Sequence, residues 1–224
     1  MGGFQEKIES SNPEQIYNTH VLIDNEGNLA ASYRKIHLFD YDQLKESDMT
    51  RAGQNIVLTE TPIGKLGLGV CYDLRFPLFF QAVRDGGATI LTVPAAFTYT
   101  TGKAHWHTLL RSRAIEHQCY VVAAAQSGFH NRNEVTQFNL QAESQGKRKK
   151  LLRHSFGHSL VIDPWGDIIA EIPYMEDSAV VADTDISQVV SIVDIDLQKV
   201  LDTRQKMPVK NHERCDIYSC VNHL

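Results

Sequence analysis

In length, composition and charge the sequence is typical of a globular domain. It has 224 residues, of which 42% are hydrophobic and 22% are charged, and its net charge is −5. A chain of this length can bury a large core in one domain. The negative charge gives no reason to expect a nucleic acid or an anionic membrane as a partner, and no apolar run is long enough to cross a membrane.

The cysteines and the N-terminus bear on the expected compartment. Cys71, Cys119, Cys215 and Cys220 are irregularly spaced, which does not suggest a disulfide framework. Residues 1–7 lack the basic and then apolar pattern of a secretory signal. We therefore expect a reducing, cytoplasmic compartment, with the mitochondrion as the alternative.

Strand-like and helix-like segments alternate along the chain. Strands are expected over residues 17–24, 29–33, 64–71, 89–93, 119–125, 159–163 and 168–172, and helices over residues 79–85 and 104–118. Turn sequences at residues 25–27 and 163–166 connect two of the expected hairpins. This alternation indicates an α/β fold whose central strands are covered on both faces.

The segment Gly67-Leu-Gly-Val-Cys-Tyr-Asp-Leu-Arg-Phe-Pro77 carries the main candidate for a nucleophile. A buried strand would lead to Cys71 and Pro77 would open a helix soon after it, so that Cys71 lies on a tight strand-to-helix turn. Such a turn exposes a side chain and directs backbone N–H groups toward it, and a thiol there can ionise if a cation or a base is near. The alternative is a buried cysteine that packs as a small hydrophobic residue.

A second segment, Tyr33-Arg-Lys-Ile-His-Leu-Phe-Asp40, supplies a candidate cation. The ammonium of Lys35 beside a reactive cysteine would lower the pKa of the thiol and stabilise the oxyanion of a tetrahedral intermediate. Glu46, a few residues downstream, could orient Lys35 or a substrate. The alternative is that both residues are solvated surface charges.

Three groups of polar residues have simpler interpretations. The basic cluster at residues 147–150 is interpreted as a solvated loop rather than a nuclear-localisation signal or a nucleic-acid site. His105 and His107 are expected at a helix start, where they do not form a metal-binding pair. The zinc-ligand residue types near the C-terminus have a spacing unlike that of zinc fingers, so we interpret them as ordinary tail residues and predict no metal site. They are His212, Cys215, Cys220 and His223.

Together these segments resemble the carbon–nitrogen hydrolase (nitrilase) superfamily. The segments around Lys35 and Cys71 carry the resemblance, which extends through residues 104–126, residues 155–166 and the sequence Met207-Pro-Val. It covers most of the chain, and its motifs are most similar to those of the Nit branch, the deaminated glutathione amidases. The resemblance implies a four-layer α-β-β-α sandwich that forms a homodimer and needs no cofactor.

The resemblance also implies catalytic roles for residues of this sequence. Cys71 is expected to attack an amide carbonyl and form a thioester, which water then hydrolyses. Lys35 and the backbone N–H of Tyr72 are expected to form the oxyanion hole, and Glu46 to position Lys35 and the substrate. The implied substrate is a small linear amide, which in the Nit branch is deaminated glutathione, cleaved to 2-oxoglutarate and cysteinylglycine.

The substrate pocket is less well defined by the sequence. Phe97, Thr98 and Trp106 are expected to line or support it, and the alternative is that the aromatic residues among them belong to the core.

One role of the family has no expected counterpart in this sequence. The general base implied by the resemblance is a glutamate upstream of the segment that resembles residues 2–6, and the first strand and helix of the sandwich are expected to be missing with it. Glu6, Glu9 and Glu14 lie in a different element, so they are not assigned this role. Residues 134–152 are expected to be an insertion.

These expectations lead to one domain assignment and two functions. Residues 1–203 are expected to form an N-terminally incomplete hydrolase domain, and residues 204–224 its C-terminal extension. The first function is an amidase, with low turnover expected because the general base has no counterpart. The alternative is a catalytically impaired, truncated isoform that acts at most as a pairing partner.

Overall fold

The structure is a computed structural model in which residues 2–8, 15–41, 44–130, 135, 152–175 and 190–218 are described. Several features discussed above lie outside these residues. They are Glu9, Glu14, the basic cluster at residues 147–150, almost all of the expected insertion at residues 134–152, Cys220 and His223.

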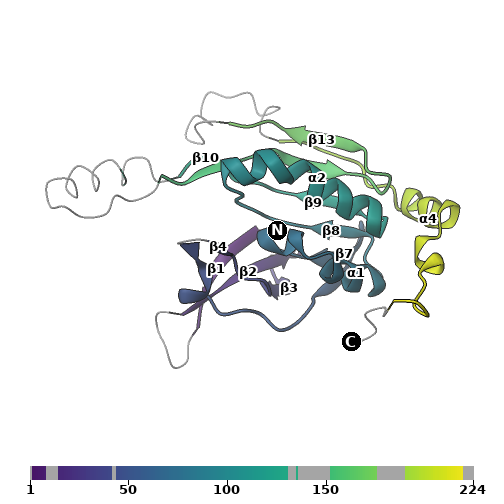
Figure 1. Cartoon of the computed structure of the whole chain (residues 1–224), viewed down its shortest axis with the longest axis horizontal. Coiled ribbons are helices and arrows are strands. Elements are labelled where there is room, and N and C mark those ends of the chain that lie inside the picture. Colours follow the sequence, from purple (N-terminus) through teal and green to yellow (C-terminus); the bar gives the residue numbers. More distant parts are fainter. Residues whose placement is uncertain are drawn as a thin grey trace, which may run out of the picture.

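A six-stranded mixed sheet forms the centre of the molecule (Figure 1). Its strand order is β13-β12-β9-β8-β7-β6, and β7, β8 and β9 run parallel while the other three pair antiparallel. All three residues of β8 are buried, so this central strand is covered on both faces, as predicted. The strands are β6 (Leu58–Thr61), β7 (Gly64–Leu68), β8 (Ile90–Thr92), β9 (Tyr120–Ala123), β12 (Ser159–Ile162) and β13 (Ile168–Ile172).

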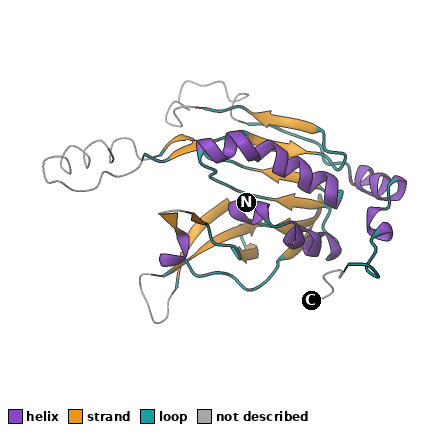
Figure 2. Ribbon diagram, in the orientation of Figure 1, coloured by secondary structure: helices purple, strands orange, loops and turns teal. Residues whose placement is uncertain are grey.

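Two helices, α1 (Pro77–Asp85) and α2 (Tyr99–His117), lie across one face of this sheet (Figure 2). Helix α1 begins at Pro77, as predicted from the fixed φ of proline at a first helical position. Helix α2 begins at Tyr99, and the prediction of residue 104 was wrong. The Thr98 hydroxyl accepts a hydrogen bond from the N–H of Thr101 and so caps the helix earlier.

The strand predicted over residues 64–71 is shorter than expected. Strand β7 ends at Leu68, and Cys71 begins a 3₁₀ helix, η2 (Cys71–Arg75). The carboxylate of Asp73 accepts a hydrogen bond from the N–H of Val70, at 2.8 Å, and this local bond turns the chain out of the sheet.

A smaller antiparallel sheet of β1 (Gly2–Lys7), β2 (Ile16–Ile23) and β3 (Leu29–Arg34) lies next to β7, at the lower side of Figure 1. The predicted hairpin between β2 and β3 is confirmed. It turns where the Asp24 carboxylate accepts hydrogen bonds from the N–H groups of Glu26 and Asn28. The His20 ring contacts the carbonyl oxygen of Gly69 at 3.0 Å, so this sheet packs against the end of β7.

The remaining elements of the described part of the chain are short. Together with the two sheets and the helices α1 and α2, they form an α/β sandwich, as predicted. Arg204 donates a hydrogen bond to the carbonyl of Ala88 at 2.8 Å, which ties α4 to the start of β8. No helix in the described part of the chain is both long enough and apolar enough to cross a membrane. These elements are β4 (Asp40–Tyr41), β5 (Leu44–Lys45), η1 (Glu46–Asp48), β10 (Ser127–Phe129), β11 (His154–Phe156), α4 (Leu197–Lys206) and η5 (Val209–His212).

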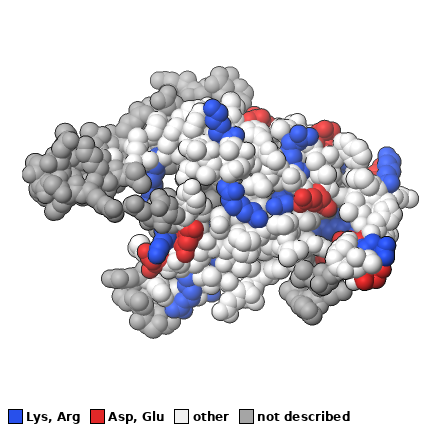
Figure 3. Space-filling model, in the orientation of Figure 1, with Lys and Arg blue, Asp and Glu red and all other residues white. Residues whose placement is uncertain are grey.

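Charged side chains are mixed on the face of the molecule shown in Figure 3. Lysines and arginines alternate there with aspartates and glutamates. The described residues on this face therefore form no patch of a single sign of the kind that binds polyanions.

Candidate active site

Cys71 lies on a strained turn between β7 and α1. Its φ is 48°, in the left-handed region that residues other than glycine rarely adopt. Its N–H donates a hydrogen bond to the carbonyl of Pro94, at 2.9 Å, which anchors the turn to the segment after β8. Strain of this kind is maintained where surrounding contacts hold it, and it is common at reactive residues.

Lys35 and Glu46, which the sequence analysis treated as partners, form an ion pair in the structure. Lys35 follows β3, and its side chain is only 2% exposed. The Glu46 carboxylate, at the start of η1, also accepts hydrogen bonds from the N–H of Phe39 at 2.7 Å and from the side chain of Asn18 at 3.2 Å. These bonds fix the carboxylate, which in turn fixes the buried ammonium.

Opposing influences act on the thiol of Cys71. Burial raises its pKa above the ordinary value, and the charges of Glu46 and Asp73 act in the same direction. The ammonium of Lys35 and a backbone hydrogen bond from Ala96 lower the pKa but do not offset the burial. Burial thus opposes ionisation of this thiol, and Lys35 is the cation that favours it.

Asp73 joins the segment of Lys35 to the segment of Cys71, a role that the sequence analysis missed. Its fully buried carboxylate accepts a hydrogen bond from the Tyr33 hydroxyl at 2.7 Å and contacts the ring of His37 at 2.7 Å. The same carboxylate binds the N–H of Val70, directly before Cys71. Because Tyr33 and His37 flank Lys35 in the sequence, Asp73 fixes the lysine segment against the cysteine turn.

Arg75 is a second residue that the sequence analysis missed. It lies at the end of η2, with its guanidinium 5.3 Å from the ring centre of Phe97 and 6.0 Å from that of Tyr72. Nη2 of Arg75 lies 3.3 Å from Nδ1 of His105. A guanidinium held over aromatic rings beside the nucleophile turn can bind a carboxylate in two-point geometry. The sequence signal that could have pointed to Arg75 is its position, as a charged residue one helical turn after Cys71.

The remaining predicted site residues differ in how deeply they are buried and in what they contact. They are Tyr72, Phe97, Thr98 and Trp106. The Tyr72 ring lies 5.9 Å from the Lys35 ammonium, and the oxyanion role of its backbone N–H stays a prediction. Phe97 is buried beneath Arg75, and Thr98 is the exposed cap of α2. Trp106 is 1% exposed and packs on Phe97 with ring centres 4.9 Å apart, so it supports Phe97 from the core.

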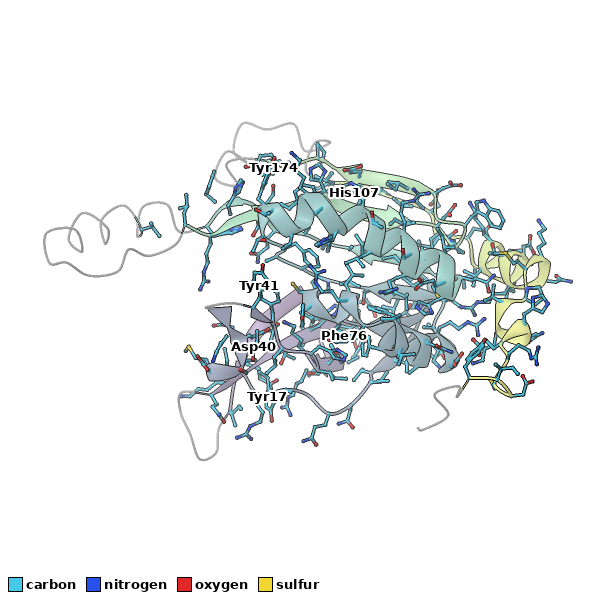
Figure 4. The ribbon with its side chains drawn as sticks, in the orientation of Figure 1. Tyr17, Asp40, Tyr41, Phe76, His107 and Tyr174 are labelled. Atoms are coloured by element: carbon cyan, nitrogen blue, oxygen red, sulfur yellow. The ribbon has the colours of Figure 1, made fainter. Side chains whose placement is uncertain are left out.

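Figure 4 labels two aromatic residues near the candidate site, Tyr41 of β4, which is exposed, and Phe76, which is partly buried directly before α1. A separate cavity of about 210 Å³ lies between α1, the end of α2 and η5, and it is lined by residues such as Arg84, His117 and Lys210. It contains none of the predicted catalytic residues.

Similar proteins and a matching family model place the chain in one family. The family model described as carbon-nitrogen hydrolase matches residues 1–205. The chain is 40% identical to deaminated glutathione amidase of Dictyostelium discoideum, over 97% of this chain and 67% of that protein. It is also 40% identical to the mouse protein of the same name, over 100% of this chain and 62% of that protein.

A solved structure shows the same fold. The crystal structure of the Caenorhabditis elegans NitFhit protein superposes with a TM-score of 0.77 and 39% identity, over 98% of this chain and 47% of that chain. The chain thus spans about two thirds or less of the length of these relatives. From the matched family model, the sequence identities and the shared fold together, it follows that this chain belongs to the carbon-nitrogen hydrolase family.

Proposed function

We propose that this chain is an amidase that cleaves a small linear amide through a thioester on Cys71. The observation that carries the proposal is the buried ion pair of Lys35 and Glu46 beside the strained turn of Cys71. A buried ammonium costs stability unless it is paired, and here it lies where it lowers the pKa of a potential nucleophile.

The reaction would proceed in two steps. The sulfur of Cys71 attacks the amide carbonyl carbon, and the resulting oxyanion is stabilised by the Lys35 ammonium and the backbone N–H of Tyr72. The C–N bond then breaks, the amine leaves with a proton, and a thioester remains. Water attacks the thioester, which releases the acid and restores the thiol.

Glu46 is assigned a positioning role in this scheme. Its carboxylate already accepts hydrogen bonds from Lys35, Phe39 and Asn18. These three donors occupy the carboxylate, so we assign it to holding Lys35 in place. The family resemblance assigns the general base to a different glutamate.

We further propose that the substrate is deaminated glutathione or an amide of similar chemistry. The relatives from Dictyostelium and mouse carry the name of that amidase. Arg75 supports an anionic substrate, because its guanidinium lies beside the cysteine turn and the expected product, 2-oxoglutarate, carries two carboxylates.

The comparisons lend no support to the alternative of an impaired pairing partner. We also propose that two copies of this chain pair as a homodimer. Half-exposed apolar side chains on the outer surface support this pairing, among them Ile115, Trp165 and Ile168. Sedimentation at several concentrations tests the pairing, and a monomer at micromolar concentration would contradict it.

Detection of the acyl-enzyme tests the proposed chemistry. The chain is incubated with deaminated glutathione, its intact mass is recorded, and the release of 2-oxoglutarate is followed. We expect an acyl adduct on Cys71 and product release, both lost in Cys71→Ala and both retained in Cys119→Ala, which removes a buried thiol elsewhere in the core. A folded chain with no adduct and no product, or equal product release from Cys71→Ala, would refute the proposal.

A further inference from the structure

Three potential metal ligands from separate elements converge on the outer side of α2. They are His107 of α2, His158 of the turn between β11 and β12, and Glu171 of β13. Nε2 of His107 lies 3.0 Å from Oε1 of Glu171, and Nδ1 of His158 lies 2.6 Å from the same oxygen. Figure 4 labels His107 on the side of α2 that faces β13.

The surroundings hold His158 in place. Its backbone has a φ of 58°, and its carbonyl oxygen accepts a hydrogen bond from the Trp106 indole at 2.7 Å. Its ring stacks on Phe156 with ring centres 4.4 Å apart. Trp106 is the residue before His107, so one core side chain helps to position both histidines. Ligands held by packing and hydrogen bonds lose little freedom when an ion binds.

We propose that His107, His158 and Glu171 form a binding site for a divalent transition-metal ion of the zinc type, with water as a fourth ligand. Two imidazoles and one carboxylate are a ligand set that Zn²⁺ binds in an open, tetrahedral site. The three ligand atoms lie within 4.8 Å of one another. Bonds of about 2.1 Å at tetrahedral angles require ligand atoms roughly 3.4 Å apart, so side-chain movements of an ångström or so would complete the site.

The position of the site suits reversible binding of an ion. The side chains of His107 and Glu171 are 35% and 34% exposed, so solvent reaches the cluster. Oε1 of Glu171 already contacts a ring nitrogen of each histidine, so an ion bound there would meet all three ligands. A bound ion would take the place of the hydrogen atoms that now link the two imidazole rings to the Glu171 carboxylate.

The consequence would be a link between α2 and the hairpin of β12 and β13. The ligands are far apart in the sequence, so an ion that binds all three restrains the packing of the helix on the edge of the sheet. Because the unfolded chain does not hold the three ligands together, the ion would stabilise the folded state by mass action.

The test is a titration of the chelator-treated Cys71→Ala variant with Zn²⁺ by calorimetry, in which the catalytic thiol cannot act as a ligand. We expect one ion to bind with a Kd in the micromolar range or tighter, with release of protons. His107→Ala and the nearly isosteric Glu171→Gln are each expected to weaken binding at least about tenfold. His212→Ala, which removes an exposed histidine of the C-terminal tail, should leave the affinity unchanged.

A Co²⁺ spectrum provides a second readout. Tetrahedral nitrogen and oxygen ligation gives intense visible bands without the near-ultraviolet charge transfer of a thiolate ligand, and we expect that spectrum. The proposal is overturned if Zn²⁺ does not bind, if His212→Ala weakens binding as much as His107→Ala, or if Co²⁺ reports thiolate ligation. Circular dichroism checks that each variant is folded. Since the titration does not measure catalysis, its failure leaves the proposed amidase unaffected.

Discussion

At the scale of single residues, the pairing of Lys35 with Glu46 decides how a positive charge is held at the cysteine turn. Lys35 is almost completely buried, and its ammonium has an ionised partner. Removing one member of such a pair leaves the other charge uncompensated, which costs several kcal/mol. The pair therefore links the stability of this region to the reactivity of Cys71.

The first prediction concerns Lys35→Met. Loss of the ammonium removes the charge that lowers the pKa of the Cys71 thiol and leaves Glu46, which raises it. The pH profile of Cys71 alkylation by iodoacetamide should therefore shift to higher pH. Lys199→Met, which removes a lysine paired with Asp163 outside the site, is the matched control and should leave the profile unchanged. An unchanged profile in Lys35→Met would contradict the electrostatic role of this lysine.

The second prediction concerns Asp73. In Asp73→Ala, the Tyr33 hydroxyl and the Val70 N–H lose a buried acceptor. The free energy of unfolding should fall by about 3 kcal/mol, measured by urea denaturation, while Tyr33→Phe should cost about 1 kcal/mol. The control is Asp85→Ala, at a solvent-exposed ion pair, where the loss should stay below about 1 kcal/mol. Equal losses in the two aspartate variants would show that Asp73 does not have the proposed role.

At the scale of elements, the approach of α1 to β7 depends on a missing side chain. A Cβ atom on Gly67 would fall 2.0 Å from Cγ1 of Val83, closer than packed atoms can lie. The helix that follows the cysteine turn therefore rests directly on the strand that precedes it. This contact fixes the direction in which the chain leaves Cys71.

The third prediction follows from this contact. Gly67→Ala should displace α1 and lower the free energy of unfolding by about 1–3 kcal/mol, as expected for overpacking. In Gly3→Ala the new Cβ would approach no atom closer than 3.7 Å, and this variant of the small sheet should be nearly neutral. Urea denaturation of the two variants measures the difference, and a neutral Gly67→Ala would mean that α1 can shift without cost.

Several element positions followed from local sequence signals, and two element ends were misplaced where a side chain acts on the backbone. Apolar runs and the turn at residues 25–27 correctly predicted the β2–β3 hairpin. The sequence analysis did not predict β1, β6 or α4. The end of β7 was misplaced because the Asp73 carboxylate bonds the backbone of Val70. The start of α2 was misplaced because Thr98 caps it. Neither hydrogen bond leaves a hydrophobic pattern in the sequence from which the end of the element could be predicted.

At the scale of the whole molecule, two buried histidines make folding depend on pH. His20 and His117 are held neutral by burial, which lowers the pKa of each to about 4. In the unfolded chain their pKa is about 6.5, so between pH 6.5 and pH 4 the unfolded state binds more protons than the folded state. The stability they contribute is complete above pH 6.5 and is lost as the pH falls through this window.

The fourth prediction is therefore a loss of stability on acidification. The free energy of unfolding should fall between pH 7 and pH 4.5, by up to about 3 kcal/mol for each histidine. His117→Gln should reduce the slope, and His212→Gln, at an exposed position, should not. Urea titrations with a chelator present keep metal binding from contributing. A slope that is the same in both variants would contradict the assignment.

The candidate site could be proposed in part because its motif is local, while its supports could not. Cys71, Lys35 and Glu46 were proposed from two short segments and a family resemblance, and their catalytic roles stay a prediction. The contact of Asp73 with His37 and the cluster of His107, His158 and Glu171 join residues that are distant in the sequence. Such contacts depend on how strands and helices pack, which a single sequence does not specify.

The carboxylate of Asp73 has a consequence for how members of such a family can diversify. It joins the lysine segment to the cysteine turn inside the core, while the ammonium of Lys35 is held by Glu46 at the start of η1. Connections that carry neither Asp73 nor Glu46 are then free to lengthen, shorten or change composition. Exchanging such loops would change the surroundings of Cys71 and leave the join between its turn and the lysine segment in place.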